Sequence, residues 1–440
     1  MKNNPPKIAM ISLGCPKNNV DSEFLLGKLY QRGFDMVQHP LEADAVIINT
    51  CGFIEPAVKE TRDNIKETLA LKKTKPDLRI IVMGCYVSKG TEKWEKTYPE
   101  LDGIFPLGSH DRIVKRLQEC FSFNQGMAPT LSCGEHARPV ATTLSHFAYL
   151  KIAEGCNRHC TFCTIPSIRG RTISKSIEDL TAESSYLAQR GVKELILIAQ
   201  DTTSYGIDRY RKPALLDLLK KLVRISGIQW IRLLYAYPEH IENELLNFIL
   251  DEPKMVHYLD MPIQHSHEKI LKQMGRSGTA SCYKSVFTAL RSADKNFCLR
   301  TTVMTGFPGE TRKEFDHLLN FIKKIKFDRL GAFKYVREKG TSSYLLSGQL
   351  DKKEMEKRRE ILMLEQQKIH FVKNASWVGK KIKTLVDVVK KEGFYQGRTF
   401  RDAPDIDAMI DIKSLKKLYP GWIGEVEITS SQEYDLEGRV

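Results

Sequence analysis

The sequence predicts an α/β protein in three parts: an N-terminal domain with a parallel sheet, a partial TIM-like (β/α)6 barrel, and a small antiparallel C-terminal β-barrel. Apolar strand-like runs alternate with amphipathic helical stretches over residues 7–120, and the same alternation restarts at Phe147. Such alternation is typical of parallel sheets covered by helices. After Trp377 only short strand-like runs remain, separated by glycines and a few prolines. That pattern favours a β-barrel at the C-terminus.

The N-terminal domain is expected over residues 1–120. Its predicted strands are KIAMISL, DAVIINT and RIIVMG, and a helical stretch follows each of the first two. Residues 121–141 lose this periodicity and are predicted to form a linker. Because a chain of 440 residues is longer than one hydrophobic core usually serves, further domains are expected beyond the linker.

The central barrel is expected over residues 142–374, and 375–440 should form the C-terminal barrel. Helix-like segments separate six predicted strands, which are AYLKIAE, KELILIA, WIRLLYA, VHYLDM, LRTTVMT and DRLGAFKYV. Successive strand and helix units of this kind build a parallel barrel whose active site lies at the carboxyl ends of the strands. A charged amphipathic helix, from about Lys352 to Asn374, should lead out of the barrel.

The composition predicts an ordinary folded protein of the cytoplasm. Apolar residues make up 42% of the chain and charged residues 28%, which argues against extensive disorder. The first residues do not resemble a signal peptide, and no window approaches the roughly eighteen apolar residues of a membrane span. The ten cysteines are therefore expected to be reduced, and clustered ones are candidate ligands. A net charge of +14 suits an acidic partner such as RNA, or solubility alone.

The strongest chemical motif is EGCNRHCTFC, which contains Cys156, Cys160 and Cys163 directly after the first predicted barrel strand. Three thiolates on one short loop can hold three irons of a 4Fe–4S cluster and leave the fourth iron open. An open iron can be chelated by the amino and carboxylate groups of S-adenosylmethionine. The alternative is a structural zinc site, but such sites usually have four ligands and no fourth Cys or His stands nearby in the sequence.

A second set of thiols, Cys15, Cys51 and Cys85, follows the three predicted strands of the N-terminal domain. The carboxyl ends of parallel strands meet at one edge of a sheet, so these thiols should converge and hold a second 4Fe–4S cluster. Each has a glycine neighbour that would let backbone approach the cluster: Gly14, Gly52 and Gly84. The alternative is that small cysteines merely fill strand ends. Four further cysteines show no such pattern and are expected to be core or incidental: Cys120, Cys133, Cys282 and Cys298.

Together these features resemble the methylthiotransferases of the radical S-adenosylmethionine superfamily over nearly the whole chain. The closest likeness is to the subgroup that acts on ribosomal protein S12, because relatives that modify tRNA usually carry another pair where Pro16 and Lys17 stand. Asn19 and Ala408 depart from the usual leucine and glycine. The motifs that carry the resemblance are SLGCPKNNVDSE, NTCGFI, YLKIAEGCNRHCTFCTIPSIRGR, LIAQDTTSYG and FDRLGAFKYVREKGT.

The resemblance implies transfer of a methylthio group to the β-carbon of an aspartate in ribosomal protein S12 of the small ribosomal subunit. It implies two 4Fe–4S clusters, two uses of S-adenosylmethionine, a sulfur donor, an electron donor and a C-terminal TRAM domain. One S-adenosylmethionine would methylate sulfur at the first cluster, and the other would be cleaved at the second cluster to a radical. The alternatives are a tRNA (adenosine) methylthiotransferase and a non-catalytic iron–sulfur protein that binds RNA or senses redox state.

Weaker candidates lie at other strand ends of the predicted barrel. Gln200, Asp201 and the turn containing Thr305, Gly306 and Glu310 are candidate contacts of S-adenosylmethionine, although that turn could simply precede a helix. His265, Arg169 and Arg171 are further polar candidates, for which structural or surface roles are equally open.

The C-terminal segment from Ala375 contains eleven basic and eleven acidic residues, so its formal charge is zero. Its acidic stretch could meet a basic ribosomal protein, or could be a solvated loop. The acidic residues of this stretch are Asp402, Asp405, Asp407 and Asp411.

Overall fold

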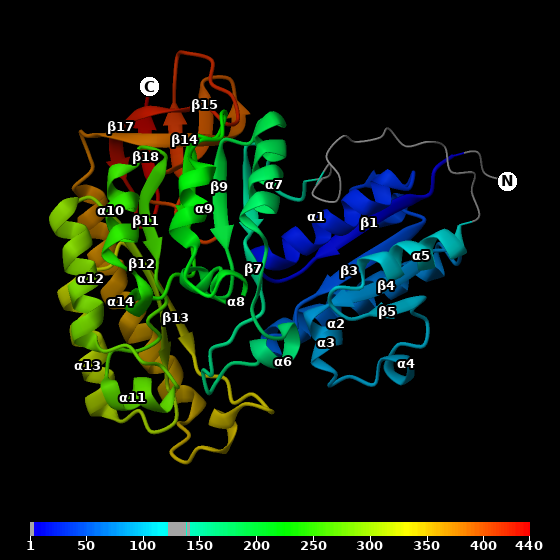
Figure 1. Ribbon diagram of the computed structural model, residues 1–440, viewed down its shortest axis with the longest axis horizontal. Helices are drawn as coiled ribbons and strands as arrows, with labels where there is room; N and C mark the ends of the chain where they lie inside the picture. Colours follow the sequence, from blue (N-terminus) through cyan, green and yellow to red (C-terminus); the bar gives the residue numbers. More distant parts are fainter. Residues whose placement is uncertain (1–3, 122–137, 139–140) are drawn as a thin grey trace.

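The computed structural model describes residues 4–121, 138 and 141–440, which form three parts in chain order (Figure 1). Most of the predicted linker 121–141, including Cys133, lies outside the described residues. Within the described ranges, no helix combines the length and the apolar composition needed to cross a bilayer. The exact boundaries at 120, 142 and 375 remain predictions.

The N-terminal part is a parallel sheet with strand order β2-β1-β3-β4-β5 and helices on both faces. The three predicted strands are its centre, whereas the edge strands β2 and β5, of three residues each, were not predicted. Alternate residues of β3 enter two separate cores, such as Val46 on one face and Ile47 on the other. The elements are β1 (Lys7–Ser12), α1 (Pro16–Gln31), β2 (Asp35–Val37), η1 (Pro40–Glu42), β3 (Ala45–Thr50), α2 (Glu55–Ala70), η2 (Leu71–Lys73), β4 (Arg79–Gly84), α3 (Cys85–Lys89), α4 (Trp94–Thr97), β5 (Gly103–Phe105) and α5 (His110–Cys120).

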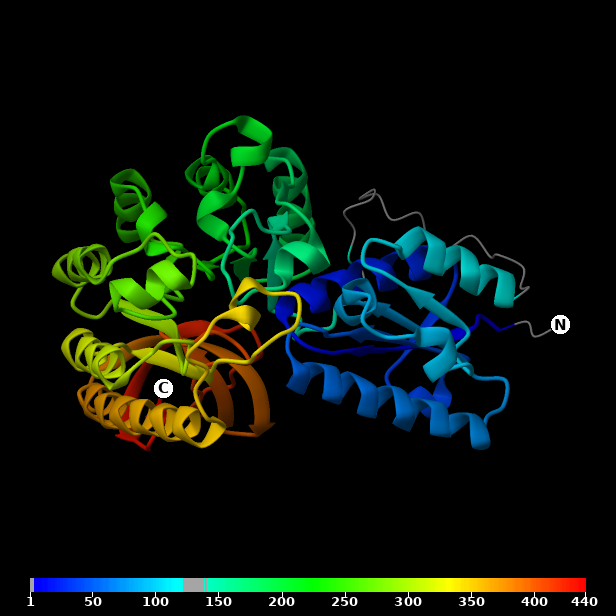
Figure 2. The same cartoon turned by 90° about the horizontal axis from the view of Figure 1, so that it is seen from below.

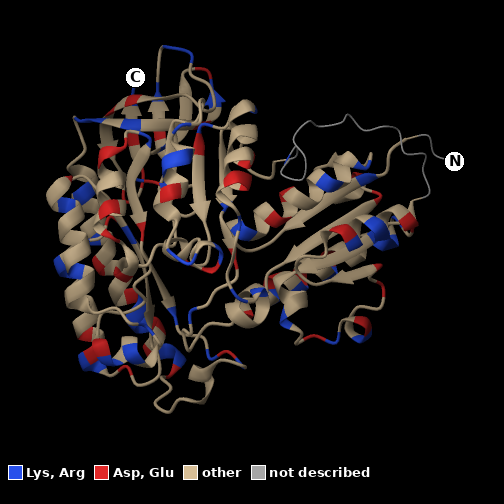
Figure 3. Cartoon of the chain, viewed as in Figure 1, with Lys and Arg blue, Asp and Glu red and all other residues tan. Residues whose placement is uncertain are grey.

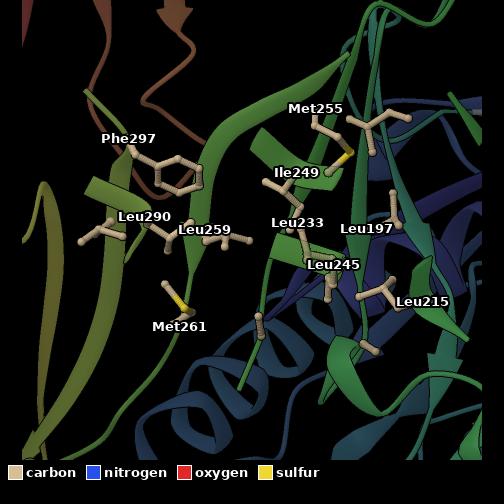
Figure 4. Packing of buried hydrophobic residues seen from close by; sticks show 14 of the residues in the cluster. Leu197, Leu215, Leu233, Leu245, Ile249, Met255, Leu259, Met261, Leu290 and Phe297 are labelled. Carbon is tan, nitrogen blue, oxygen red and sulfur yellow. The ribbon is translucent and has the colours of Figure 1, made fainter. Parts of the chain in front are cut away.

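The central part is an open arc of six parallel strands in the order β13-β12-β11-β10-β9-β6, and it confirms the six predicted strands. Helices cover its outer surface over an apolar core, part of which is shown in Figure 4. The strands are β6 (Phe147–Lys151), β9 (Glu194–Ile198), β10 (Trp230–Leu233), β11 (Met255–Asp260), β12 (Cys298–Thr305) and β13 (Arg329–Lys334), with a small ribbon of β7 (Ala153–Glu154) and β8 (Ile173–Ser174).

Two helices cover the edges of this arc, where unpaired strands would otherwise be exposed. Helix α1 of the N-terminal part packs against β6, and α14, the predicted exit helix, packs against β13. The helices of the central part are α6 (Ile165–Arg169), α7 (Ile177–Gln189), η4 (Thr202–Ser204), α8 (Ile207–Tyr210), α9 (Leu215–Leu222), η5 (Pro238–His240), α10 (Asn243–Asp251), α11 (Glu268–Gln273), α12 (Ala280–Ala293), α13 (Arg312–Ile325), η6 (Ser342–Leu345) and α14 (Lys352–Ala375).

The C-terminal part is a closed barrel in the order β14-β15-β16-β18-β17. It confirms the predicted barrel but corrects its description as antiparallel throughout, because β16 and β18 pair in parallel. The last strand, of four residues, is too short to show a clear pattern in the sequence. The strands are β14 (Lys381–Lys391), β15 (Phe394–Thr399), β16 (Ile410–Lys413), β17 (Ile423–Ser431) and β18 (Leu436–Arg439).

The C-terminal barrel closes the amino-terminal end of the arc (Figure 1). Glu194, at the start of β9, receives hydrogen bonds from Arg232 (2.7 Å) and from Arg398 of the C-terminal barrel (2.8 Å). Because these three side chains are almost wholly buried, each charge needs its partner. The carboxyl ends of the strands therefore remain on the opposite side, facing the N-terminal part.

The N-terminal part adjoins these carboxyl ends (Figure 2). In that view the yellow segment near residue 340 extends toward it, where Glu338 accepts a hydrogen bond from Lys89 of α3 (2.7 Å). Arg138, from the linker region, is buried and pairs with Glu23 of α1 (2.7 Å) and Glu183 of α7 (3.0 Å). The two parts thus meet through buried or nearly buried charges.

Candidate functional site

The structure places Cys15, Cys51 and Cys85 at the carboxyl ends of β1, β3 and β4, which are neighbours in the sheet. Cys15 is the residue before α1, and Cys85 is the first residue of α3. The predicted convergence of three thiols from distant sequence positions follows from this strand order. All three are free cysteines.

Close packing around these thiols explains why a glycine stands at position 14, next to Cys15. Gly14 has φ +92°, and a Cβ there would lie 2.8 Å from the Cys51 sulfur, so another side chain would displace that thiol. Asn18 ties the loops together, because its amide donates to the carbonyls of Leu13 (2.8 Å) and Thr50 (3.2 Å). Its Oδ1 lies 3.6 Å from the Cys85 sulfur. Sequence reasoning did not single out Asn18, since only the fold brings these loops together.

Burial raises the pKa of the Cys51 thiol and raises that of Cys85 to about 12, while the positive charge of Arg169 acts in the opposite direction. Buried thiols of this kind become stable thiolates when they bind a metal, because iron replaces the proton. The three-thiol donor set and the confined backbone fit a 4Fe–4S cluster with one open iron.

The second triplet, Cys156, Cys160 and Cys163, lies in the loop between β7 and α6. The Cys156 sulfur accepts a hydrogen bond from the Arg158 backbone N–H, and the Cys163 sulfur accepts one from the Ile165 backbone N–H, both at 3.4 Å. Burial raises the pKa of Cys163 to about 12. Backbone N–H groups directed at sulfur suit cluster thiolates, since hydrogen bonds to the ligand sulfurs stabilise and tune such clusters.

The ligand geometry gives no support to the zinc interpretation of this loop. In the part of the chain that the structure describes, no three side chains of His, Cys, Asp or Glu converge closely enough to hold a single metal ion. A cluster presents a separate iron to each thiolate, so its ligands stand further apart than those of one zinc ion. Thiols that do not converge on one point are compatible with a cluster, and the assignment of the six cysteines as its ligands stays a prediction.

The two cysteine loops face each other across the junction between the parts. Thr164, next to Cys163, donates a hydrogen bond from its hydroxyl to the carbonyl of Phe53, two residues after Cys51 (3.4 Å). Helix α3, which begins at Cys85, packs against α6, which begins two residues after Cys163. Figure 1 shows these two short helices side by side. A substrate at this junction can therefore approach both triplets.

Arg169 of α6 joins the two parts at the same place. Its guanidinium donates to Asn18 (2.5 Å) and Asp21 (3.3 Å) of α1 and to Glu154 of the barrel (2.6 Å). Its side chain is only 1% exposed. The sequence offered Arg169 as a possible cofactor anchor, and the structure shows it as a buried bridge between the parts. Arg171, by contrast, is exposed.

Gln200 and Asp201 lie at the end of β9, beside the Cys156 loop. Both polar atoms of the Gln200 amide are buried without a hydrogen-bond partner among the described residues. Asp201 accepts two hydrogen bonds from Arg158 (2.9 and 2.7 Å). A hollow of about 210 Å³ includes Cys156, Arg158 and Asp201 in its lining. An unpartnered buried amide and a hollow beside the triplet fit a polar cofactor such as S-adenosylmethionine, and this role remains a prediction.

For Thr305, Gly306 and Glu310, the structure favours the turn over a cofactor contact. The Glu310 carboxylate is buried, binds Arg358 of α14 (2.7 Å) and accepts the Gly306 backbone N–H (3.1 Å). A Cβ at Gly306 would lie 2.1 Å from the side chain of Met355, so this turn packs tightly on α14. His265 is also buried, 3.5 Å from Glu310.

The acidic stretch of the C-terminal barrel requires a correction, because two of its carboxylates are buried against the central barrel. Asp402 pairs with Arg329, and Asp407 accepts from Arg300 (3.2 Å) and from the Tyr258 hydroxyl (2.7 Å). Neither can meet a partner protein, since each side chain is only 2% exposed.

The two other acidic residues of this stretch are more accessible. Asp405 is exposed, although its carboxylate accepts a hydrogen bond from the Tyr149 hydroxyl (3.1 Å). Asp411 is exposed and pairs with Lys390 (2.8 Å). Contact of these two residues with substrate stays a prediction.

Comparison with known proteins assigns a family to each part of the chain. Residues 7–106 match the family described as "Uncharacterized protein family UPF0004", residues 150–322 the radical SAM superfamily, and residues 378–440 the TRAM domain.

The fold is similar to that of two solved radical S-adenosylmethionine enzymes. The methyltransferase TsrM from Kitasatospora setae has a TM-score of 0.55 at 12% identity, with 74% of this chain and 72% of that chain covered. The cobalamin-dependent enzyme OxsB has a TM-score of 0.51 at 12% identity, with 82% of this chain and 56% of that chain covered. These two similarities concern the fold, and the family model that matches residues 150–322 assigns the arc with its three-cysteine loop to the radical S-adenosylmethionine superfamily.

Curated relatives define the family more closely, since the similarity extends over both entire chains. The ribosomal protein uS12 methylthiotransferase RimO of Carboxydothermus hydrogenoformans is 42% identical over 434 residues, covering 98% of this chain and 99% of the relative. The same enzyme of Clostridium kluyveri is 43% identical over 440 residues, covering 99% of this chain and 98% of the relative. The chain belongs to the ribosomal protein uS12 methylthiotransferase family. The cofactors of this family are S-adenosylmethionine and two 4Fe–4S clusters.

Proposed function

We propose that this enzyme adds a methylthio group to the β-carbon of an aspartate in ribosomal protein uS12. One observation of the structure carries the proposal: the two three-cysteine loops face each other, with Thr164 hydrogen-bonded to the backbone beyond Cys51. A transfer that needs both a radical and a sulfur donor requires two such sites within reach of one substrate. The names of the relatives supply the substrate.

When bound, the clusters and S-adenosylmethionine supply the radical, the sulfur and the methyl group that replace a hydrogen on an unactivated carbon. The chain's own residues hold and shield these groups. Cys15, Cys51 and Cys85 would hold one cluster, and the loop of Cys156 the other. Arg158 is fixed by its two hydrogen bonds to Asp201 and orients the backbone that donates to the Cys156 sulfur.

The C-terminal barrel supports a protein substrate over tRNA. Its basic and acidic residues are equal in number, and Figure 3 shows both signs along its ribbon. Arg398 and Arg401, which would otherwise be candidate phosphate contacts, are each only 1% exposed and are used in internal ion pairs. A surface that binds a nucleic acid backbone is expected to carry an excess of exposed cations.

The test offers both substrates to one enzyme preparation. The purified chain is reconstituted with iron and sulfide, reduced, and incubated with S-adenosylmethionine and either ribosomal protein uS12 or tRNA. Mass spectrometry should find one added methylthio group on uS12, located on an aspartate by peptide mapping. A methylthio group on tRNA alone would replace this proposal with the tRNA alternative. Absence of 5′-deoxyadenosine would favour the non-catalytic alternative.

We further propose that a sulfur donor and an electron donor serve the reaction. The electron that cleaves S-adenosylmethionine must come from a separate donor, because neither the clusters nor S-adenosylmethionine provides it. A ribosomal protein as substrate supports a location in the cytoplasm, where the thiols would stay reduced.

A further inference from the structure

Lys17, the second residue of α1, extends from the N-terminal part to the mouth of the central barrel. Lys17 is only 7% exposed, which is unusual for a lysine. The ammonium lies 3.6 Å from the centre of the Tyr235 ring. Tyr235 follows β10, so this ring stands at the carboxyl end of a barrel strand. Lys17 is also two residues from Cys15, and it therefore lies between the N-terminal triplet and the barrel.

The ammonium of Lys17 forms no ion pair among the described residues, whereas three other buried cations nearby do. The ammonium lies over the Tyr235 ring; burial lowers the pKa of Lys17, while the charges of Cys15, Glu154 and Asp260 raise it. Arg169 holds Asp21 and Glu154, Lys151 holds the same two carboxylates, and Arg300 holds Asp260 and Asp407. A buried ammonium without a direct ion-pair partner is costly, so a carboxylate brought by a ligand would be bound strongly.

The surroundings of Lys17 are fixed before any ligand arrives. Tyr235 has φ +59°, a left-handed backbone conformation that is strained for a tyrosine. Its backbone N–H donates to Asp260 (3.3 Å), and Asp260 is in turn neutralised by Arg300 (2.8 Å). Asp260 is thus already engaged with a cation, and the ring below the ammonium cannot move freely. Strain of this kind is typical of functional sites.

We propose that Lys17 binds the side-chain carboxylate of the substrate aspartate and thereby selects an acidic side chain over a nucleobase. In an aspartate the β-carbon is bonded directly to the carboxylate carbon, so pairing with this ammonium would hold the β-carbon between the N-terminal triplet and the barrel. The inference rests on the proposed function. It gives a physical role to the Pro16–Lys17 pair, which in the sequence only marked a subgroup: proline fixes the start of α1, and lysine supplies the charge.

The test compares two peptides that differ in one group. A uS12 peptide containing the target aspartate, and the same peptide with asparagine in its place, are titrated against the reconstituted full chain by fluorescence anisotropy. The unchanged chain should bind the aspartate peptide about 10- to 100-fold more tightly, as expected for a hydrogen bond to a charged group. Lys17→Met should lower affinity for the aspartate peptide to that for the asparagine peptide. Lys17→Arg should keep part of the preference.

The control is Lys28→Met, on the same helix, where the lysine forms a surface pair with Asp111 (2.6 Å). It should leave both affinities unchanged. Equal weakening of both peptides by Lys17→Met would show that Lys17 only joins α1 to the barrel, and would overturn the inference. An undiminished preference for aspartate in Lys17→Met would overturn it as well. Methylthio transfer to the aspartate peptide by the unchanged chain is measured in parallel, and its absence would overturn the proposed function itself.

Discussion

Replacing Arg169 with methionine should separate the two cysteine loops and reduce methylthio transfer more than radical formation. Arg169 is 1% exposed and donates to Asn18, Asp21 and Glu154. Breaking a buried ion pair costs about 3–5 kcal/mol. Lys151 still pairs with both carboxylates in the variant, so the lower value is expected. About 3 kcal/mol corresponds to roughly a hundredfold change in the folding equilibrium.

Two assays measure the effect of Arg169→Met. The free energy of the first unfolding transition in urea should fall by about 3 kcal/mol. Transfer to uS12 should fall more than production of 5′-deoxyadenosine, since only transfer needs both loops. The matched control is Arg171→Met, because Arg171 is exposed and lies two residues away. An ordinary surface substitution changes the free energy of unfolding by about 0.5 kcal/mol or less. If the unfolding free energies of Arg169→Met and Arg171→Met differed by no more than about this amount, the reasoning would be refuted.

Two further predictions concern the thiol packing and the link to the C-terminal barrel. Gly14→Ala should prevent loading of the N-terminal cluster, because the φ of Gly14 is +92° and a Cβ there would lie 2.8 Å from the Cys51 sulfur. The control is Gly90→Ala, where a Cβ would have nothing within 4 Å, and this variant should keep the full iron content. Burial opposes ionisation of Asp402, but the charges of Arg329 and Arg401 outweigh it and hold its pKa below 3.8. This contribution to stability is therefore present above pH 3.8 and is lost as the pH falls further. Asp402→Asn should lower the free energy of unfolding at pH 7 by about 3 kcal/mol and flatten its acid dependence in urea titrations; an unchanged acid slope would contradict this.

Much of the fold could be predicted from the sequence, because the inner strands are continuous apolar runs bounded by glycine and polar residues. The runs at Ala45–Thr50 and Glu194–Ile198 are fully buried and carry a strong signal. Strands of three or four residues, such as Asp35–Val37 and Leu436–Arg439, lie at a sheet edge or close a barrel and are specified by their neighbours. Local pattern cannot reveal the parallel pairing of β16 with β18.

In the candidate site too, features with a local sequence signal could be predicted and contacts between distant segments could not. Spacing and strand ends identified the six cysteines, because the chemistry of a cluster loop is local and parallel strands end at one edge. Contacts between distant segments had no local signal: Arg169 meets Asn18 across 151 residues. Asp402 looked like a surface charge for the same reason, since its partner Arg329 lies 73 residues away in the chain. Glu310 lies in the predicted turn after β12, and its contact with Arg358 of α14 had no local signal either.

The central claim is that the two facing cluster sites have separate tasks, one forming the radical and the other delivering sulfur. One measurement on Cys51→Ala tests it most directly. The reconstituted variant is incubated with S-adenosylmethionine, reductant and uS12, and both products are quantified by mass spectrometry. The expected result is continued formation of 5′-deoxyadenosine by the Cys156 loop without any methylthio group on uS12. Methylthio-modified uS12 formed at the rate of the unchanged chain would contradict the assignment of Cys51 to a sulfur-delivering site.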